Sequence, residues 1–399
     1  MRLPRSAAKK PKQHSVFSDR TNWELTPNKL TTLLDELRRK NVPLYDLTES
    51  NPTHCGFSYP PGILSALTHP KNLEYAPQAQ GMLNIREAVC AYYKKNGIAV
   101  KPEQVFLTAS TSEAYFFLFR LLLNPNERVL FPAPSYPLFQ FLVDLNDIQM
   151  ETYPLVYEEG WQIDLKGLAN KIPNETRAMV VVNPNNPTGS YVKPKELAVM
   201  NGICSQNQMA LISDEVFFDY SFDATEKKVS LIANNKNLTF VLGGLSKTLG
   251  LPQMKLAWIV VNGPSGQVRN AIERLEVIAD TYLSVNTPVQ NAVPEWFNFQ
   301  FSIQDQIRTR TKRNWDYILK VLPKDIECLA IEGGWYAVLK LPEQIDEETF
   351  TLELLQEDHV YIHPGYFFDF VEAPYAVVSL IPPEDIFQEG FRRLVKRAA

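Results

Sequence analysis

A lysine in a glycine-flanked turn is the residue of this sequence best suited to chemistry. Lys247 lies in VLGGLSKTLGLPQMK, residues 241–255, after a short apolar run that predicts a strand. Partial burial in such a turn lowers the pKa of the amine and makes it a nucleophile, which is what a Schiff-base lysine needs to bind an aldehyde cofactor. A lysine that follows a strand is more often a solvated loop residue, so the run alone leaves both interpretations open.

Two further polar residues follow apolar runs. Asp214 lies in ALISDEVF, residues 210–217, and Asn186 lies in VVVNPNNPTG, residues 180–189. Three predicted strand ends therefore carry a carboxylate, an amide and an amine. Ligands of open α/β sheets bind outside the carboxyl ends of the strands, so we expect these side chains to share one site.

The elements that would position these residues alternate between strand and helix. We predict strands at 105–108, 128–131, 178–182, 209–213, 239–242 and 258–261, and helices at 113–123, 138–145 and 194–206. This alternation predicts an α/β fold whose large domain has a mostly parallel sheet covered by helices. A long charged helix at 307–322 and strands at 335–341 and 376–380 predict a smaller α+β domain formed from both chain ends.

The predicted domains divide the 399 residues into four parts. Residues 1–14 are expected to be a disordered tail, with a nucleic-acid-binding arm as the alternative, because they are basic and no apolar stretch follows them. Residues 15–50 form the N-terminal part of the small domain, 51–292 the large cofactor-binding domain, and 293–399 the C-terminal part of the small domain.

Composition narrows the class of protein. A net charge of -5 gives no reason to expect a nucleic-acid partner, and no run of about eighteen apolar residues predicts a membrane span. The four cysteines show neither paired nor metal-like spacing, so reduced thiols in a cytoplasmic protein are expected. The five histidines form no cluster, and we predict no metal site.

The order and spacing of these segments resemble the fold type I, pyridoxal-phosphate-dependent aminotransferases of class I/II. The resemblance runs from about residue 44 to about residue 394, and it rests on at least five motifs whose conjunction is specific. It implies that pyridoxal 5'-phosphate is bound by Lys247. The substrate amine would displace this lysine, which would then carry a proton between the substrate and the cofactor.

The resemblance also implies how the cofactor phosphate is held. Ser110, Thr111 and Ser112, between the run VFLT and a Phe- and Leu-rich helix, match the phosphate loop, although an ordinary helix cap is the simpler interpretation of these residues. Lys255 stands where the family normally has an arginine on the phosphate, and Gly244 stands where many members have a serine.

The resemblance assigns the remaining cofactor contacts as follows. Tyr75, in NLEYAPQAQG, matches a tyrosine that reaches the phosphate of a neighbouring subunit, which implies a homodimer with shared active sites; by itself it reads as a packed turn aromatic. Tyr136, in PSYP, would stack on the cofactor ring, Asp214 would pair with the ring nitrogen, and Asn186 would bind the ring hydroxyl. Phe217 occupies a position where many members have a tyrosine.

The usual clamp for a substrate carboxylate is missing from the pattern. Val377 falls at the position of the family's C-terminal arginine, Ser50 replaces a glycine near the carboxylate, and Thr281 falls where some members bind a side-chain carboxylate. Arg20 or His363 could supply the positive charge, although both are better explained as structural residues. Otherwise the substrate lacks a free α-carboxylate, as in an amine, amino alcohol or conjugated amino acid, or the alignment of this strand is shifted.

The resemblance therefore predicts a cytoplasmic, homodimeric aminotransferase that moves an amino group from an amino donor to a 2-oxo acid by a ping-pong mechanism. A pyridoxal-phosphate-dependent C–S lyase or decarboxylase is the alternative on the same fold, because a fold does not determine the reaction. A degenerate relative without enzymatic activity is a second alternative, favoured by Val377 and Phe217 and opposed by Lys247, Asp214 and Asn186.

Overall fold

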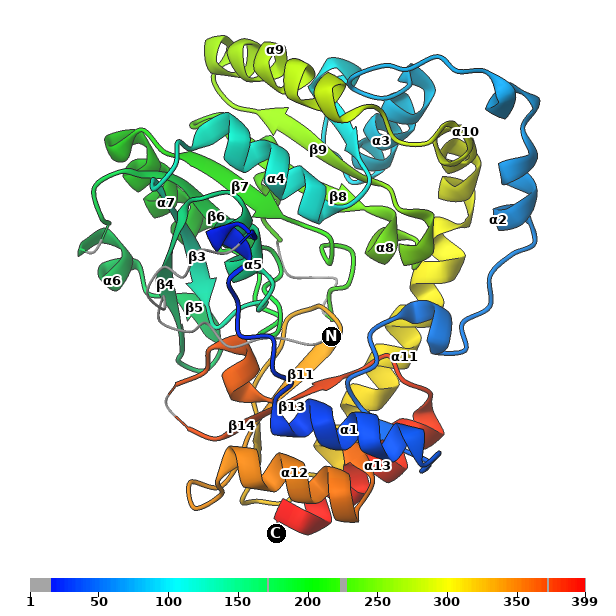
Figure 1. Ribbon diagram of the computed structural model, residues 1–399, viewed down its shortest axis with the longest axis vertical. Helices are drawn as coiled ribbons and strands as arrows, with labels where there is room; N and C mark the ends of the chain where they lie inside the picture. The colour runs from blue at the N-terminus through cyan, green and yellow to red at the C-terminus, as the bar shows by residue number, and fades with distance from the viewer. Residues whose placement is uncertain (1–15, 171, 223–227, 372, 399) are drawn as a thin grey trace.

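The fold is described here from a computed structural model that covers residues 16–170, 172–222, 228–371 and 373–398 (Figure 1). The tail predicted at residues 1–14 lies outside the described residues. The helices are α1 Lys29–Arg39, α2 Gly62–Ser65, α3 Leu83–Lys95, α4 Thr111–Leu122, α5 Phe139–Leu145, α6 Leu165–Asn170, α7 Pro194–Asn207, α8 Leu245–Thr248, α9 Ser265–Tyr282, α10 Thr287–Trp296, α11 Gln300–Val321, α12 Glu347–Glu357 and α13 Glu384–Ala398.

Within the described residues, the large sheet holds eight strands in the order β2-β9-β8-β7-β6-β3-β4-β5. They are β2 Val105–Thr108, β3 Arg128–Ala133, β4 Gln149–Tyr157, β5 Trp161–Ile163, β6 Thr176–Val182, β7 Ala210–Asp214, β8 Thr239–Gly244 and β9 Ala257–Asn262. Neighbours from β8 to β4 pair in parallel, whereas β9 runs antiparallel to both β8 and β2, and β5 antiparallel to β4. The predicted α/β class with a mostly parallel sheet is confirmed.

Helices cover both faces of this sheet because successive strand residues point to opposite sides. One face, with Val180, Ile212 and Phe240, packs against α4, α5 and α9. The other face, with Val181, Leu211 and Val241, packs in a larger apolar cluster that includes α3, α7 and α10. The strands therefore form the middle of three layers. Because helices cover both faces of the sheet, a binding site can form only at the ends of the strands.

A smaller sheet lies beside the large one, in the lower part of Figure 1. Its strands are β10 Glu327–Cys328, β11 Tyr336–Lys340, β14 Tyr375–Ser379 and β13 His363–Pro364, in that order and antiparallel. Near the start of the chain, β1 Tyr45–Asp46 pairs in parallel with β12 Val360–Tyr361. The N- and C-terminal parts of the chain are thus joined, as the small domain requires, while its exact boundaries stay predictions.

The helices of the described residues also bear on the question of a membrane. None of them combines the length and the apolar character that crossing a bilayer demands.

Candidate active site

The three predicted strand ends meet at one edge of the large sheet. Asp214 pairs with Val182 on one side and with Leu242 on the other. The N–H of Asn183 donates to the carbonyl oxygen of Asp214 over 2.8 Å, so the loop that carries Asn186 leaves the sheet directly beside Asp214. Lys247 follows β8 in the short helix α8. The structure therefore brings Asn186, Asp214 and Lys247 together, and these three residues with their contacts are called the cluster below.

Lys247 is half-buried between aromatic rings. Its Nζ lies 4.5 Å from the centre of the Trp335 ring and 5.1 Å from that of Phe217. Its main-chain oxygen accepts a 2.6 Å hydrogen bond from the hydroxyl of Tyr220, which fixes the turn. Burial lowers the pKa of the amine to about 8, against the opposing charges of Asp214 and Glu49. About a tenth of this amine is therefore neutral and nucleophilic at pH 7, far more than for a lysine with the ordinary pKa.

Asp214 is a buried carboxylate with few partners. The hydroxyl of Tyr115, on α4, donates to its Oδ2 over 3.1 Å, and the N–H of Val216 lies 3.3 Å from its Oδ1. Burial raises the pKa of Asp214 to about 6, while these two donors and Lys247 hold it lower than burial alone would. The group is mostly ionised at neutral pH, so it can pair with a cationic ring nitrogen.

Asn186 and Tyr136 lie in loops that are bound to one another. The side-chain amide of Asn185 donates to the main-chain oxygen of Pro134 over 3.0 Å, which ties the loop after β6 to the loop after β3. Asn186 is 8% exposed, and its Oδ1 has no hydrogen-bond partner among the described residues. Tyr136 is 37% exposed and lies beside a cavity of about 550 Å³. An unsatisfied buried amide is costly, so a ligand group is expected to complete it.

The predicted phosphate contacts lie at the same sheet edge. Thr108 at the end of β2 pairs with Ala257, and Ala257 pairs with Gly244 at the end of β8. The loop with Ser110, Thr111 and Ser112 and the exposed Lys255 therefore flank the turn of Lys247. Ser110 also caps α4, its Oγ accepting from the N–H of Glu113 over 3.2 Å. The capping interpretation and the anion-binding interpretation are compatible, because a helix N-terminus favours an anion.

Tyr75 is strongly exposed in this structure. Its side chain is 81% exposed, in the stretch between η4 Pro70–Leu73 and α3. It is therefore not the packed aromatic that the sequence suggested as the simpler interpretation. Its contact with the phosphate of a second subunit stays a prediction.

The predicted substrate residues separate into two groups. The hydroxyl of Ser50 forms a hydrogen bond with Tyr336 on β11, near Tyr136. Arg20 does not reach the cluster: its Nε donates to Asp147 over 2.7 Å, at the far end of α5. His363 is enclosed by the rings of Tyr361, Phe367 and Phe368, and burial lowers its pKa to about 4. As placed here, neither Arg20 nor His363 offers a positive charge to the cluster.

Val377 is fully buried and pairs with His363 across β13 and β14. It belongs to the apolar cluster of Phe217 and Trp335, whereas its neighbours Ala376 and Val378 face the core of the small sheet. The side of the strand that faces the cluster therefore carries an isopropyl group where the resemblance led us to look for an arginine. Thr281 is exposed on α9, and its Oγ1 donates to the carbonyl oxygen of Val277 over 2.8 Å.

Four residues of the cluster were missed by the sequence analysis: Tyr115, Trp335, Tyr336 and Glu49. Trp335 and Tyr336 begin a predicted strand immediately after Gly333 and Gly334. This position at the start of a strand is the sequence feature that could have identified them. Nothing in the sequence pattern singles out Tyr115, because it lies among the apolar residues of α4. Within the described residues, no group of three or more His, Cys, Asp or Glu side chains is placed to bind a metal ion.

Comparison with known proteins identifies the family to which this fold belongs. Residues 63–377 match the family "Aminotransferase class I and II", so the chain belongs to this family. Glutamate-pyruvate aminotransferase AlaA of Escherichia coli is 28% identical over 88% of this chain and 89% of its own, and that of Haemophilus influenzae 26% over 90% and 92%. The solved alanine aminotransferase from Pyrococcus furiosus superposes with a TM-score of 0.84, at 26% identity, over 92% of this chain and 95% of that one.

Enzymes of this family depend on pyridoxal phosphate, and the described residues fit that cofactor. A lysine amine with a lowered pKa, an ionised buried carboxylate and an unsatisfied amide oxygen lie together at the sheet edge. The N-terminus of α4 at Ser110 and the cationic Lys255 have the chemistry to hold an anionic group. The chain is a pyridoxal-phosphate-dependent aminotransferase.

Proposed function

We propose that Lys247 is the catalytic residue of this aminotransferase and that Asp214, Asn186, Tyr136, Lys255 and the loop of Ser110, Thr111 and Ser112 hold the cofactor. The observation that carries the proposal is the meeting of Asn186, Asp214 and Lys247 at the ends of three paired strands. Pyridoxal phosphate supplies an aldehyde that condenses with amines and a ring that withdraws electrons from the reacting carbon.

Lys247 has the properties of a group that moves a proton. With a pKa of about 8, its Nζ is able both to accept a proton from the reacting carbon and to return it near neutral pH. Asp214 keeps its negative charge at the same pH and so favours a protonated ring nitrogen. Trp335 and Phe217 exclude water from one side of the amine, which preserves this balance.

Each active site is proposed to be completed by a second copy of the chain. The support is Tyr75, whose side chain is 81% exposed and therefore accessible to a second chain. A location in the cytoplasm is also proposed, supported by the four cysteines, which are all free.

The donor and acceptor are proposed to be a small amine and a 2-oxo acid. The names of the relatives indicate glutamate, pyruvate and alanine as substrates of those proteins. Thr281 falls where some members of the family bind a side-chain carboxylate with an arginine, and it is exposed on α9, so a dicarboxylate donor is not favoured here.

A half-reaction tests the role of Lys247. Purified protein loaded with pyridoxal phosphate is mixed with one amino donor at a time, and pyridoxamine phosphate is measured without an acceptor. We expect its formation with the wild type and a loss of about 10²–10⁴-fold in the Lys247→Ala variant, because a positioned acid–base contributes in that range. Phosphate-dependent binding of the cofactor should persist in the variant. Unchanged turnover in Lys247→Ala would defeat the assignment.

A further inference from the structure

Three aromatic rings contact both ends of Lys247. The hydroxyl of Tyr220 donates to the main-chain oxygen of Lys247 over 2.6 Å, and the ring of Tyr220 packs edge-on against Trp335, with 5.0 Å between the ring centres. The centre of the Trp335 ring lies 4.5 Å from Nζ of the same lysine. Phe217 completes the group, because its ring centre lies 5.1 Å from Nζ and 5.2 Å from that of Trp335. These three rings are called the aromatic corner below.

The aromatic corner is fixed to both parts of the fold. All three of its rings are buried. The main-chain oxygen of Trp335 accepts from the N–H of Leu380 over 2.7 Å, which ties this residue to the end of β14 in the small sheet. The N–H of Gly334 donates to the main-chain oxygen of Tyr220 over 2.8 Å, which ties the same stretch to the loop after β7. A ring held from both sides in this way can define where an amine lies.

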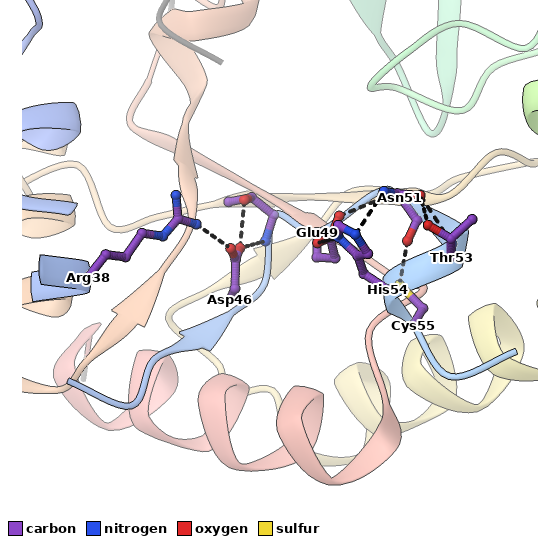
Figure 2. A network of polar contacts seen from close by, with 8 residues as sticks. Arg38, Asp46, Glu49, Asn51, Thr53, His54 and Cys55 are labelled. Atoms are coloured by element: carbon purple, nitrogen blue, oxygen red, sulfur yellow. Dashed lines mark hydrogen bonds and ion pairs between the residues drawn. The ribbon is translucent and has the colours of Figure 1, made fainter. Parts of the chain in front are cut away.

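The other titratable groups that act on the amine are Asp214, at the end of β7, and Glu49 and Cys55, in the segment after β1. Figure 2 shows Glu49 and Cys55 bonded within their own segment: Glu49 accepts from the N–H of Asn51 over 2.8 Å, and the thiol of Cys55 donates to the main-chain oxygen of Asn51 over 3.3 Å. Among the described residues, no carboxylate reaches Nζ of Lys247 with an ion pair or a hydrogen bond. The ring faces of Trp335 and Phe217 are therefore the groups that stabilise its charge at close range.

We propose that Trp335, together with Phe217, is a positioning residue whose ring face holds the ammonium form of Lys247 within the cluster. The negative face of an aromatic ring attracts a cation within about 6 Å of its centre, and tryptophan does so more strongly than the other aromatic side chains. Both distances lie inside this limit. The rings favour the lysine after it has taken up a proton, which is the state from which it returns that proton. This inference rests on the proposed role of Lys247.

Two possible roles of Trp335 predict opposite changes in the pKa of Lys247. A ring that attracts the ammonium raises this pKa because it favours the charged form, so weakening the attraction lowers the pKa. A ring that only excludes water lowers the pKa, so a replacement that admits water raises it. The pH midpoint of amine modification, measured by peptide mass spectrometry, follows this pKa. It is measured on the full chain without cofactor and again with pyridoxamine phosphate, which leaves the lysine amine free.

Fluorinated tryptophan isolates the attraction from the exclusion of water. Fluorine withdraws electrons from the indole and weakens its negative face, while the ring keeps nearly the same size. The protein is made with tryptophan, with monofluorotryptophan and with difluorotryptophan. We expect the midpoint of Lys247 to fall stepwise along this series, by roughly half a pH unit to one pH unit in total, because a desolvated contact between a cation and a ring contributes on that scale.

Two variants show which tryptophan is responsible. Trp335→Phe keeps an aromatic ring and removes the indole, so fluorinated tryptophan should no longer move the midpoint of Lys247 in this variant. Trp161→Phe is the matched control: Trp161 is also buried, but its ring contacts Tyr157 and Phe370. The series should move the midpoint in Trp161→Phe as much as in the wild type.

A midpoint that stays unchanged or rises with fluorination, or that moves equally in Trp335→Phe, would overturn the proposal. If Trp335→Phe fails to fold, the series in the wild type and in Trp161→Phe still provide the test, because Trp335 is the tryptophan found over Nζ in the described part of the chain. Failure of the proposed function is distinguishable: it is seen as unchanged turnover in Lys247→Ala, whereas labelling without substrate reports only the contact between the ring and the amine.

Discussion

Lys247 shows how a single amine is tuned by opposing influences. Burial favours its neutral form, whereas the charges of Asp214 and Glu49 and the faces of the Trp335 and Phe217 rings favour its cationic form. Burial is the largest of these influences, and the pKa falls to about 8. The amine is thus able to attack a carbonyl group and also to carry a proton at the pH of the cell.

The pH dependence of its reactivity follows from this shift. Reagents that modify amines attack only the neutral form, so modification of Lys247 in the cofactor-free protein should be half-maximal near pH 8. Exposed lysines, with an ordinary pKa of about 10.4, should still be gaining reactivity at that pH. Because Asp214 favours the cationic form, Asp214→Asn should move the midpoint to lower pH. Peptide mass spectrometry of protein labelled at a series of pH values gives the midpoint, and one near pH 10 would contradict the assignment.

The site residues that could be predicted from the sequence are those that directly follow a predicted strand. Asn186, Asp214 and Lys247 follow apolar runs directly, and parallel strands deliver such residues to one edge. Tyr115 and Glu49 came to the site only through tertiary packing, since one lies on a helix of the core and the other in a loop of the small domain. Arg20 was suggested by charge alone, and its charge is taken up by Asp147.

At the scale of elements, the turn of Lys247 depends on how closely β8 and β9 approach one another. Gly243 on β8 lies opposite Trp258 on β9, and the indole of this tryptophan fills the space where a side chain would be. A Cβ at position 243 would lie 2.5 Å from the ring. The close packing of β8, the strand that precedes α8, against Trp258 therefore requires glycine at position 243.

A pair of glycine substitutions tests this packing. Gly243→Ala should lower the free energy of unfolding by about 1–3 kcal/mol or more, because the ring has to move, and should loosen the turn of Lys247. Gly202→Ala is the matched control: Gly202 lies inside α7 with nothing within 4 Å of the added carbon, so the gain in helix propensity should stabilise the protein by up to about 1 kcal/mol. Urea unfolding of both variants measures the difference. Equal stabilities would show that the indole yields freely.

Most strands of the large sheet lie within two residues of their predicted positions, because buried parallel strands are short continuous apolar runs. The antiparallel direction of β9 was not readable, since a run of apolar residues carries no direction. β4 was not predicted: it contains several exposed and half-buried residues and lacks such a run. The two-residue strands β10 and β13 are too short to leave a pattern, and pairing with β11 and β14 defines them.

At the scale of the whole molecule, one stretch of the chain exposes three large side chains. Leu64, Leu73 and Tyr75, all between η2 Pro52–His54 and α3, are 69%, 95% and 81% exposed, and Figure 1 shows this stretch along one side of the molecule near α10. Large apolar side chains grouped in this way are typical of a protein interface. In the proposed homodimer, this stretch is the surface that we expect to meet the second chain.

Mixed dimers test whether Tyr75 serves the neighbouring site. Tyr75→Phe should weaken cofactor binding by roughly tenfold or more, because a hydrogen bond to a charged group contributes about 1.5–3 kcal/mol, and Lys247→Ala has no amine to be trapped. A dimer with one chain of each kind restores one complete site: the intact Lys247 of one chain with the intact Tyr75 of the other. At low cofactor concentration, mixing should therefore increase the borohydride-trapped adduct on Lys247. Mixing Tyr75→Phe with the double variant Lys247→Ala/Tyr75→Phe builds no complete site and should give no increase. If both mixtures give the same amount of adduct, Tyr75 acts within its own chain or has no role in cofactor binding. Either result contradicts the proposal that the two chains share their active sites.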